Sequence, residues 1–145
     1  MEFYKTSEPI NIGILMKVES ELDISFSEGF KKHYLRYNGG CPEKYVFLWN
    51  DSETTIINGF FSIKYKGFDN IESIYKNLVL EENYIPKKIL PFAFDVGGNF
   101  FCVSFRDNDY DHIYYAEDGH YNVNHNEEHL TLATKSFEDL LKNLI

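Results

Sequence analysis

Residues 90–103 read LPFAFDVGGNFFCV, and this stretch decides the fold. Two apolar, aromatic runs flank the segment Asp95-Val96-Gly97-Gly98-Asn99. Glycine adopts the backbone conformations that a tight turn needs, and apolar runs on both sides of such a turn are typical of a β-hairpin. We therefore predict two antiparallel strands, over residues 89–94 and 100–105.

Other short runs rich in aromatic and β-branched residues surround this hairpin and predict further strands. They cover residues 45–49, 54–57, 112–115 and 130–133, the last as an edge strand. Polar turn residues separate them, for example Asn50 to Glu53 and Arg106 to Asp111. The middle of the chain is therefore predicted to form a mainly antiparallel sheet.

Segments with helical periodicity lie before, between and after these strands. Apolar residues spaced three to four apart predict helices over residues 8–22 and 69–80. Ser27 can cap a second helix and Ser136 the last one. Asn38-Gly39-Gly40 ends the helix that follows Ser27, because Asn and Gly tolerate the left-handed backbone at a helix C-terminus. We expect the buried side of that helix to carry Phe30, Tyr34, Leu35 and Tyr37.

Helices at both termini around a mainly antiparallel sheet make an α+β layer fold. The regular strand-helix alternation of a doubly wound parallel sheet is missing from this order of elements. The sequence shows no internal repeat and no linker. We therefore expect one domain over residues 1–145.

Composition excludes several classes of function. The 145 residues are 43% hydrophobic, which excludes a disordered chain, and the formal net charge of −9 disfavours direct nucleic-acid binding. Two cysteines are too few for the disulfide framework of a small secreted domain. The N-terminus does not resemble a signal peptide, and no window approaches the roughly 20 apolar residues of a membrane span. We expect a cytoplasmic protein that does not associate with a membrane.

Four ordered features make the chain similar to the SUKH superfamily, which includes bacterial toxin-immunity proteins and fungal cell-wall assembly regulators. They are the helix that follows Ser25-Phe26-Ser27 and ends in Asn38-Gly39-Gly40; the strand and turn with Leu90-Pro91-Phe92 and Asp95-Val96-Gly97-Gly98-Asn99; the strand Ile113-Tyr114-Tyr115-Ala116-Glu117; and the closing helix with Ser136-Phe137-Glu138-Asp139-Leu140. Phe26 stands where the family usually has proline. The resemblance covers residues 8–145.

The resemblance implies a SUKH-like fold and a binding protein without catalysis or cofactor. Bacterial members typically sit against a cognate toxin domain, often a nuclease or a deaminase, and block it. The resemblance therefore implies an immunity protein that neutralises a toxin. A general regulatory scaffold with several weaker partners is an alternative interpretation.

Catalytic and metal-binding patterns are weak in this sequence. His112, His120, His125 and His129 cluster, and the alternative to a binding protein is a metal- or small-ligand-dependent enzyme that uses the region His112 to His129. The pair His125 and His129 has the spacing of a zinc helix, but Asn126 replaces the general-base Glu. Asp107 to Asp118 resembles a calcium loop, but His112 occupies the position of its essential Gly. A polar turn and a polar loop are the better interpretations.

Acidic residues gather in the two segments around residues 112–115. Such a surface attracts a basic partner and accelerates its association, whereas aromatic side chains provide contact area. We therefore predict that a partner contacts Asp107, Asp109, Tyr110, Asp111, Glu117, Asp118, Tyr121, Glu127 and Glu128. The alternative is that the excess charge keeps the protein in solution.

Overall fold

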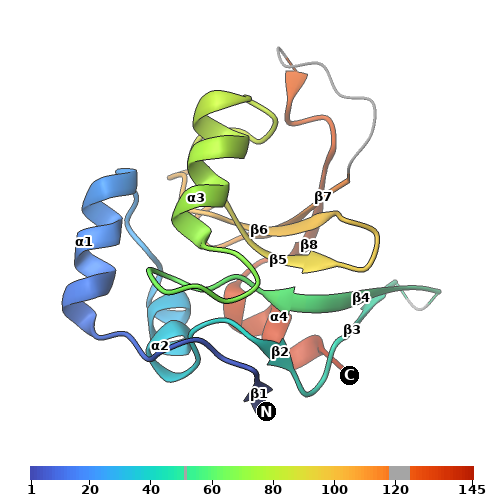
Figure 1. The fold of residues 1–145 in the computed structure, drawn as a ribbon. Coiled ribbons are helices and arrows are strands. Elements are labelled where there is room, and N and C mark those ends of the chain that lie inside the picture. Colours follow the sequence, from blue (N-terminus) through green and yellow to red (C-terminus); the bar gives the residue numbers. More distant parts are fainter. Residues whose placement is uncertain (51, 118–124) are drawn as a thin grey trace.

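The computed structural model describes residues 1–50, 52–117 and 125–145, and its centre is an antiparallel sheet of six strands in the order of the chain (Figure 1). The strands are β3 (Val46–Trp49), β4 (Glu53–Phe60), β5 (Ile89–Asp95), β6 (Phe100–Ser104), β7 (Ile113–Ala116) and β8 (Leu130–Thr134). A separate pair joins β1 (Phe3–Tyr4) to β2 (Cys41–Pro42). The predicted hairpin is β5 and β6.

Helices precede, interrupt and follow the sheet. They are α1 (Ile12–Leu22), α2 (Glu28–Arg36), α3 (Ile71–Tyr75) with its π-helical continuation η1 (Lys76–Glu81), and α4 (Phe137–Asn143). In Figure 1, α3 lies in front of the sheet, and it contacts β5. The α4 helix contacts α2, β3 and β8. The predicted α+β class, with a mainly antiparallel sheet and helices at both ends, is confirmed.

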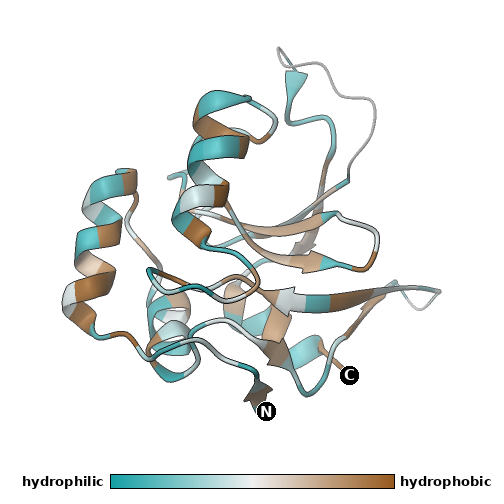
Figure 2. Cartoon of the chain, viewed as in Figure 1, coloured by the Kyte–Doolittle hydropathy of each residue, from teal (hydrophilic) through white to brown (hydrophobic). Residues whose placement is uncertain are grey.

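A chain of aromatic rings connects the helices to the sheet. The ring of Phe137 packs edge-on against Phe30 of α2 and Phe92 of β5, with centroids 5.4 and 5.2 Å apart, and Phe92 contacts Phe60 at 5.3 Å. Figure 2 shows brown stretches on the central strands β5 and β6 and alternating brown and teal along α1 and α3. On α2, Phe30 and Tyr34 are buried as predicted. Leu35 is 39% exposed, because it lies on the solvent side of the helix, so that part of the prediction is wrong.

The segment Asn38-Gly39-Gly40 joins α2 to two other parts of the chain. The buried Asn38 amide donates to the carbonyl oxygens of Glu8 and Ile63, and its oxygen accepts the Ile63 N–H at 2.7 Å. Gly39 and Gly40 have φ values of 76° and 98°. A Cβ atom on Gly40 would lie 2.4 Å from the carbonyl oxygen of Tyr4, so this position also needs glycine for the close approach of β1.

The β5–β6 turn is held by Asp95. Its Oδ1 accepts the N–H groups of Gly97 and Asn99 at 2.9 and 2.8 Å, and its other oxygen accepts the hydroxyl of Tyr115 on β7. Gly98 has a φ of 84°, which glycine adopts without strain. A register shift follows Pro91 in the same hairpin. One carboxylate thus orders the turn and ties it to the next strand.

The predicted helix over residues 69–80 is α helical only in its first part. It continues as η1, in which the Glu82 N–H donates to Asn77 at 3.0 Å, five residues earlier. Ile71 and Val79 are buried on the two halves. Apolar spacing indicated the buried face correctly, but it does not distinguish these two hydrogen-bond patterns.

Candidate functional site

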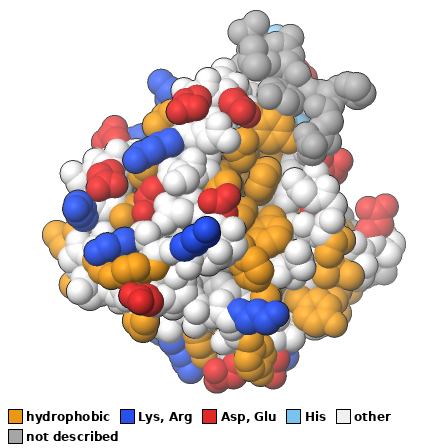
Figure 3. Space-filling view, in the orientation of Figure 1, with side chains coloured by type: hydrophobic (Ala, Val, Ile, Leu, Met, Phe, Trp, Pro, Cys, Tyr) orange, Lys and Arg blue, Asp and Glu red, His pale blue; other side chains and the backbone are white. Residues whose placement is uncertain are grey.

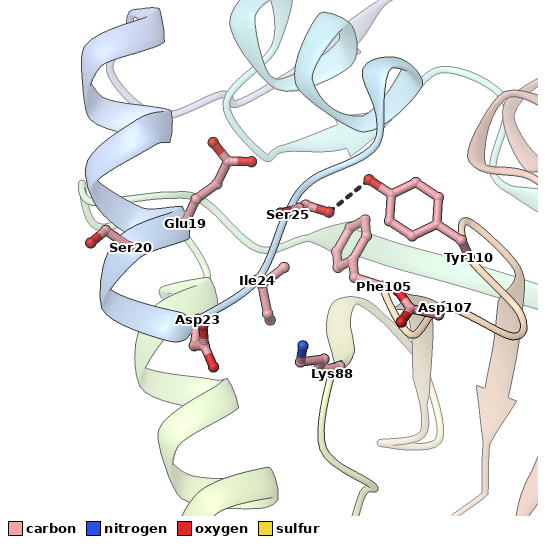
Figure 4. A pocket seen from close by; sticks show the side chains of 9 residues that line it. All are labelled: Glu19, Ser20, Asp23, Ile24, Ser25, Lys88, Phe105, Asp107 and Tyr110. Carbon is pink, nitrogen blue, oxygen red and sulfur yellow. Dashed lines mark hydrogen bonds between the residues drawn. The ribbon is translucent and has the colours of Figure 1, made fainter.

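An acidic cleft opens between the end of α1 and the turn after β6 (Figure 4). Its volume is about 380 Å³. The lining residues come from three separate parts of the chain: Glu19, Ser20, Asp23, Ile24, Ser25, Lys88, Phe105, Asp107 and Tyr110. Ile24 and Phe105 are buried and form its apolar base, whereas polar groups surround its mouth. Two of the predicted partner-binding residues, Asp107 and Tyr110, therefore line one cavity.

Negative charge dominates this acidic cleft. Glu19, Asp23 and Asp107 carry carboxylates, against the single ammonium of Lys88. Among the described residues, Lys88 makes no ion pair within 4.0 Å. The Glu19 carboxylate also accepts the Phe26 N–H at 2.8 Å, which anchors it. The cleft is thus suited to receive a cationic side chain.

Tyr110 stands at the mouth of the acidic cleft. Its side chain is 42% exposed, and its hydroxyl donates to the carbonyl oxygen of Ser25 at 2.7 Å. Partial burial and the nearby Asp111 charge raise the pKa of this hydroxyl, so it stays protonated. An exposed aromatic ring that is already fixed by a hydrogen bond offers contact area and loses little conformational entropy when a partner binds.

The Asp109 side chain is buried and hydrogen-bonded within the fold. It is only 6% exposed, and it accepts hydrogen bonds from Ser104 Oγ at 2.5 Å, Tyr114 Oη at 2.7 Å and Arg106 Nη2 at 2.5 Å. Burial by itself would raise the pKa of this carboxyl, but the Arg106, Ser104 and Tyr114 donors together hold it well below its usual range. The same contacts raise the pKa of the Arg106 guanidinium. Donors from β6, the turn and β7 occupy both carboxylate oxygens, so we do not expect Asp109 to contact a partner.

Asp111 connects the starts of two helices. One carboxylate oxygen accepts the Ser27 hydroxyl at 2.6 Å, and the other accepts the Phe137 N–H at 3.4 Å. Ser27 is the N-cap of α2, and Phe137 is the first residue of α4. A negative charge at helix N-termini is favourable. Partner contact by Asp111 stays a prediction, but its carboxylate already has a structural role.

The remaining predicted residues lie on other parts of the surface. Glu127 forms an ion pair with Arg106, so the 106–111 turn and the segment before β8 lie side by side. Glu128 is exposed. Glu117 lines a different hollow, which it shares with Glu53 and Trp49. Asp118 and Tyr121 fall outside the described residues. The structure therefore does not gather all the predicted residues into one site.

The histidine cluster is only partly described, because His120 lies outside the described residues. The two ring nitrogens of His129 lie 3.1 Å from the Glu117 carbonyl oxygen and 2.7 Å from that of Tyr84. Among the described residues, no three His, Cys, Asp or Glu side chains are placed to hold a metal ion. In the 107–118 calcium pattern, Asp118 lies outside the described residues, and Asp109 and Asp111 bind the protein partners given above. The metal-dependent alternative stays a prediction without a described ligand set.

Sequence reasoning missed Glu19, Asp23 and Lys88 as members of the acidic cleft. They stand far from Asp107 in the chain, and no motif connects them. The packing of the end of α1 beside the 105–110 segment brings Glu19 and Asp23 there, and the hydrogen bond from Phe105 N–H to the Lys88 carbonyl oxygen places Lys88. The described part of the cleft holds no histidine or cysteine that could activate Ser20 or Ser25 for nucleophilic chemistry. Its geometry favours binding.

The fold and the site define an α+β protein with a meandering antiparallel sheet, a flanking pair β1–β2 and an acidic cleft. A comparison of the sequence with known protein families agrees with the order of the sequence motifs described above. The SMI1 / KNR4 family (SUKH-1) matches residues 9–143, nearly the whole chain, and the protein belongs to this family. The comparison with curated proteins gives no match. Within the described residues, no helix has the length and apolar character needed to cross a membrane.

Proposed function

We propose that this protein is a non-catalytic binding protein, an immunity protein that neutralises a cognate toxin by covering the basic cleft where the toxin binds its substrate. Membership of the SMI1 / KNR4 family supports a role in protein–protein interaction. The observation that carries the proposal is the acidic cleft with Tyr110 at its mouth. A nuclease or a deaminase that acts on nucleic acid needs a cationic surface, which this cleft complements.

We choose the residues that would contact the toxin by the exposure of their side chains. Asp107, Tyr110 and Glu128 are exposed, and no ion pair within the described residues uses the two carboxylates. The Tyr110 ring would supply contact area, and Asp107 with Glu19 would receive a lysine or arginine of the toxin. Glu127 adds charge at the edge of this surface, although Arg106 neutralises part of it. The exposed carboxylates would chiefly accelerate association.

The test uses a toxin captured from the source organism and then purified. The variant Asp107→Lys/Glu128→Lys reverses two exposed charges without removing a described hydrogen bond. We expect it to slow association with the toxin by about tenfold or more at low salt, with a smaller effect at about 0.5 M salt. Surface plasmon resonance measures both rates.

Glu8→Lys/Glu43→Lys is the matched control, because it makes the same charge change at exposed positions outside both the cleft and the segment that carries Glu128. We expect its association rate to fall by less than twofold. Equal slowing by both variants would assign the effect to net charge and remove Asp107 and Glu128 from the interface. A captured partner whose enzymatic activity is unchanged in the complex would contradict neutralisation itself.

A further inference from the structure

His33 is a buried polar side chain with an unused nitrogen. It is 8% exposed, and among the described atoms its Nε2 has no hydrogen-bond partner. Aromatic rings surround it: Phe3 lies edge-on with its centroid 4.7 Å away, and Phe137 and Phe60 follow at 5.4 and 5.6 Å. Buried polar atoms normally have partners, since each unpaired one costs free energy. This nitrogen is shielded from solvent, so a group outside the chain can reach it only when a side chain that covers it moves.

His33 lines a pocket of about 540 Å³ between α2, α4 and the N-terminal strand. This volume falls in the range of ligand-binding pockets. Phe3, Leu141 and Leu144 give it an apolar wall. The pocket shares no residue with the acidic cleft and uses none of the residues of the proposed function. It is a separate site.

Positive charge surrounds this second pocket, in contrast to the net charge of −9 for the chain. Lys32 and Arg36 come from α2, Lys44 from the segment before β3, and Lys142 from α4, with Glu138 as the one carboxylate in the lining. The three lysines make no ion pair within the described residues. The Arg36 guanidinium lies 5.2 Å from the centroid of the Tyr37 ring. Four cations beside one anion favour a negatively charged ligand.

We propose that this basic pocket binds an acidic, apolar peptide segment of a protein partner. An apolar side chain would lie against Phe3, Leu141 and Leu144, and carboxylates on both sides of it would reach the cations. The cations stand on three different elements around the opening, which suits several carboxylates along a chain better than one compact anion. Movement of a covering side chain on binding would let His33 Nε2 bond a carbonyl or carboxylate oxygen of that segment. Burial lowers the pKa of His33 to about 4, with a smaller contribution from Arg36, so the ring is neutral at pH 7.

The first experiment titrates the purified protein into the fluorescein-labelled peptide Asp-Glu-Phe-Leu-Glu-Asp and follows anisotropy at about 50 mM salt. We expect this peptide to bind at least tenfold more tightly than Lys-Lys-Phe-Leu-Lys-Lys or Asp-Glu-Ser-Ser-Glu-Asp. Equal affinity for all three would overturn the proposal. Complete displacement by 5 mM inorganic phosphate would also overturn it, because the pocket would then be a simple anion site.

Lysine-to-glutamine variants test whether the peptide binds in this pocket. We expect Lys32→Gln/Lys142→Gln to weaken binding at least tenfold, whereas Lys17→Gln/Lys87→Gln, which changes two exposed lysines outside the pocket, weakens it less than twofold. Equal weakening by both pairs would overturn the proposal. The Asp107→Lys/Glu128→Lys variant should still bind the peptide, so failure here and failure of the proposed function are distinguishable.

His33→Phe tests the unpaired nitrogen while it preserves an aromatic ring at this position. We expect at least threefold weaker peptide binding with no fall in the melting temperature. The ¹H–¹³C signal of the His33 ring, assigned by its loss in this variant, should shift when the wild-type protein binds the peptide. An unmoved signal would place the peptide elsewhere. A wild-type dimer in sedimentation whose contact covers the pocket would identify the occupant as a second copy and overturn the peptide proposal.

Discussion

Two buried polar side chains in this protein have opposite surroundings. Asp109 receives hydrogen bonds from Ser104, Arg106 and Tyr114, whereas His33 has an Nε2 atom without a partner among the described residues. Asp109 lies between Asp107 and Tyr110, which line the acidic cleft, and His33 lies on α2 and lines the basic pocket. The difference teaches that residue type alone does not identify a functional group. Asp109, whose hydrogen bonds are complete, stabilises the fold, whereas the incomplete bonding of His33 is what the peptide proposal tests.

The largest expected effect is that of Asp109→Ala. It leaves the half-buried Arg106 guanidinium and the hydroxyls of Ser104 and Tyr114 without their acceptor. We expect a loss of about 3 kcal/mol in the free energy of unfolding, measured by urea denaturation. Asp107→Ala removes a neighbouring exposed carboxylate, and we expect it to change the stability by less than about 0.5 kcal/mol. A loss below about 1 kcal/mol for Asp109→Ala would contradict its structural role.

The pH dependence of the stability of Asp109→Ala tests whether the Asp109 pKa is lowered in the folded protein. The folded-state pKa of Asp109 lies below its unfolded value of about 3.9, so its charge stabilises the fold above that pH. This contribution is lost as the pH falls toward the folded-state pKa. The difference in stability between the wild type and Asp109→Ala should therefore shrink below about pH 4. A difference that grows on acidification would contradict the lowered pKa.

His33 should behave differently on acidification. Its pKa is lowered to about 4 in the folded protein, so between about pH 6.5 and pH 4 the unfolded chain binds a proton that the folded one does not. The wild type should therefore lose about 3 kcal/mol of stability to this group across that range. His33→Phe should lack this loss and be as stable as the wild type at pH 7. Urea denaturation of both proteins at pH 7 and pH 4 measures the difference, because the other acidic groups are common to both.

A smaller effect is expected for Asp111→Asn. The amide preserves the shape of the side chain, and Asn tolerates the φ of 71° at this position, but the charge at the starts of α2 and α4 is lost. We expect about 1 kcal/mol of destabilisation by thermal or urea unfolding. Asp139→Asn, in the first turn of α4, is the control for the general loss of a helix N-terminal charge. Equal effects would mean that Asp111 does not connect the two helices.

The sequence predicted the features that depend on neighbouring residues. The β5–β6 hairpin follows from the apolar runs around Gly97-Gly98, and the limits of α2 follow from Ser27 and the Asn-Gly-Gly segment. The function of individual carboxylates could not be predicted in this way. Asp107 and Asp109 stand two residues apart, yet one faces solvent and the other accepts the bonds of Arg106. The donors that decide this difference come into place only when the strands pair.

The acidic cleft and the basic pocket were beyond sequence reasoning for a related reason. Each is built from elements that the chain connects only through the whole fold, such as α1 with the 105–110 segment, or α2 with α4. Figure 3 shows acidic and basic side chains interspersed on the face it presents, so net charge does not reveal local charge. Lys32 and Arg36 are exposed on α2. Their position beside Lys142 could not be deduced from their spacing.

The smallest expected effect concerns the exposed end of Arg106. Glu127 pairs with this guanidinium, but its side chain is 62% exposed, and such pairs contribute little because water and salt screen them. We expect Glu127→Gln to change the free energy of unfolding by less than about 0.5 kcal/mol, with Glu128→Gln as the unpaired control. A loss above 1 kcal/mol that persists at high salt would contradict this. One arginine would thus make a strong bond to the buried Asp109 and a weak one to Glu127, which shows that burial, more than charge, decides which carboxylate the fold depends on.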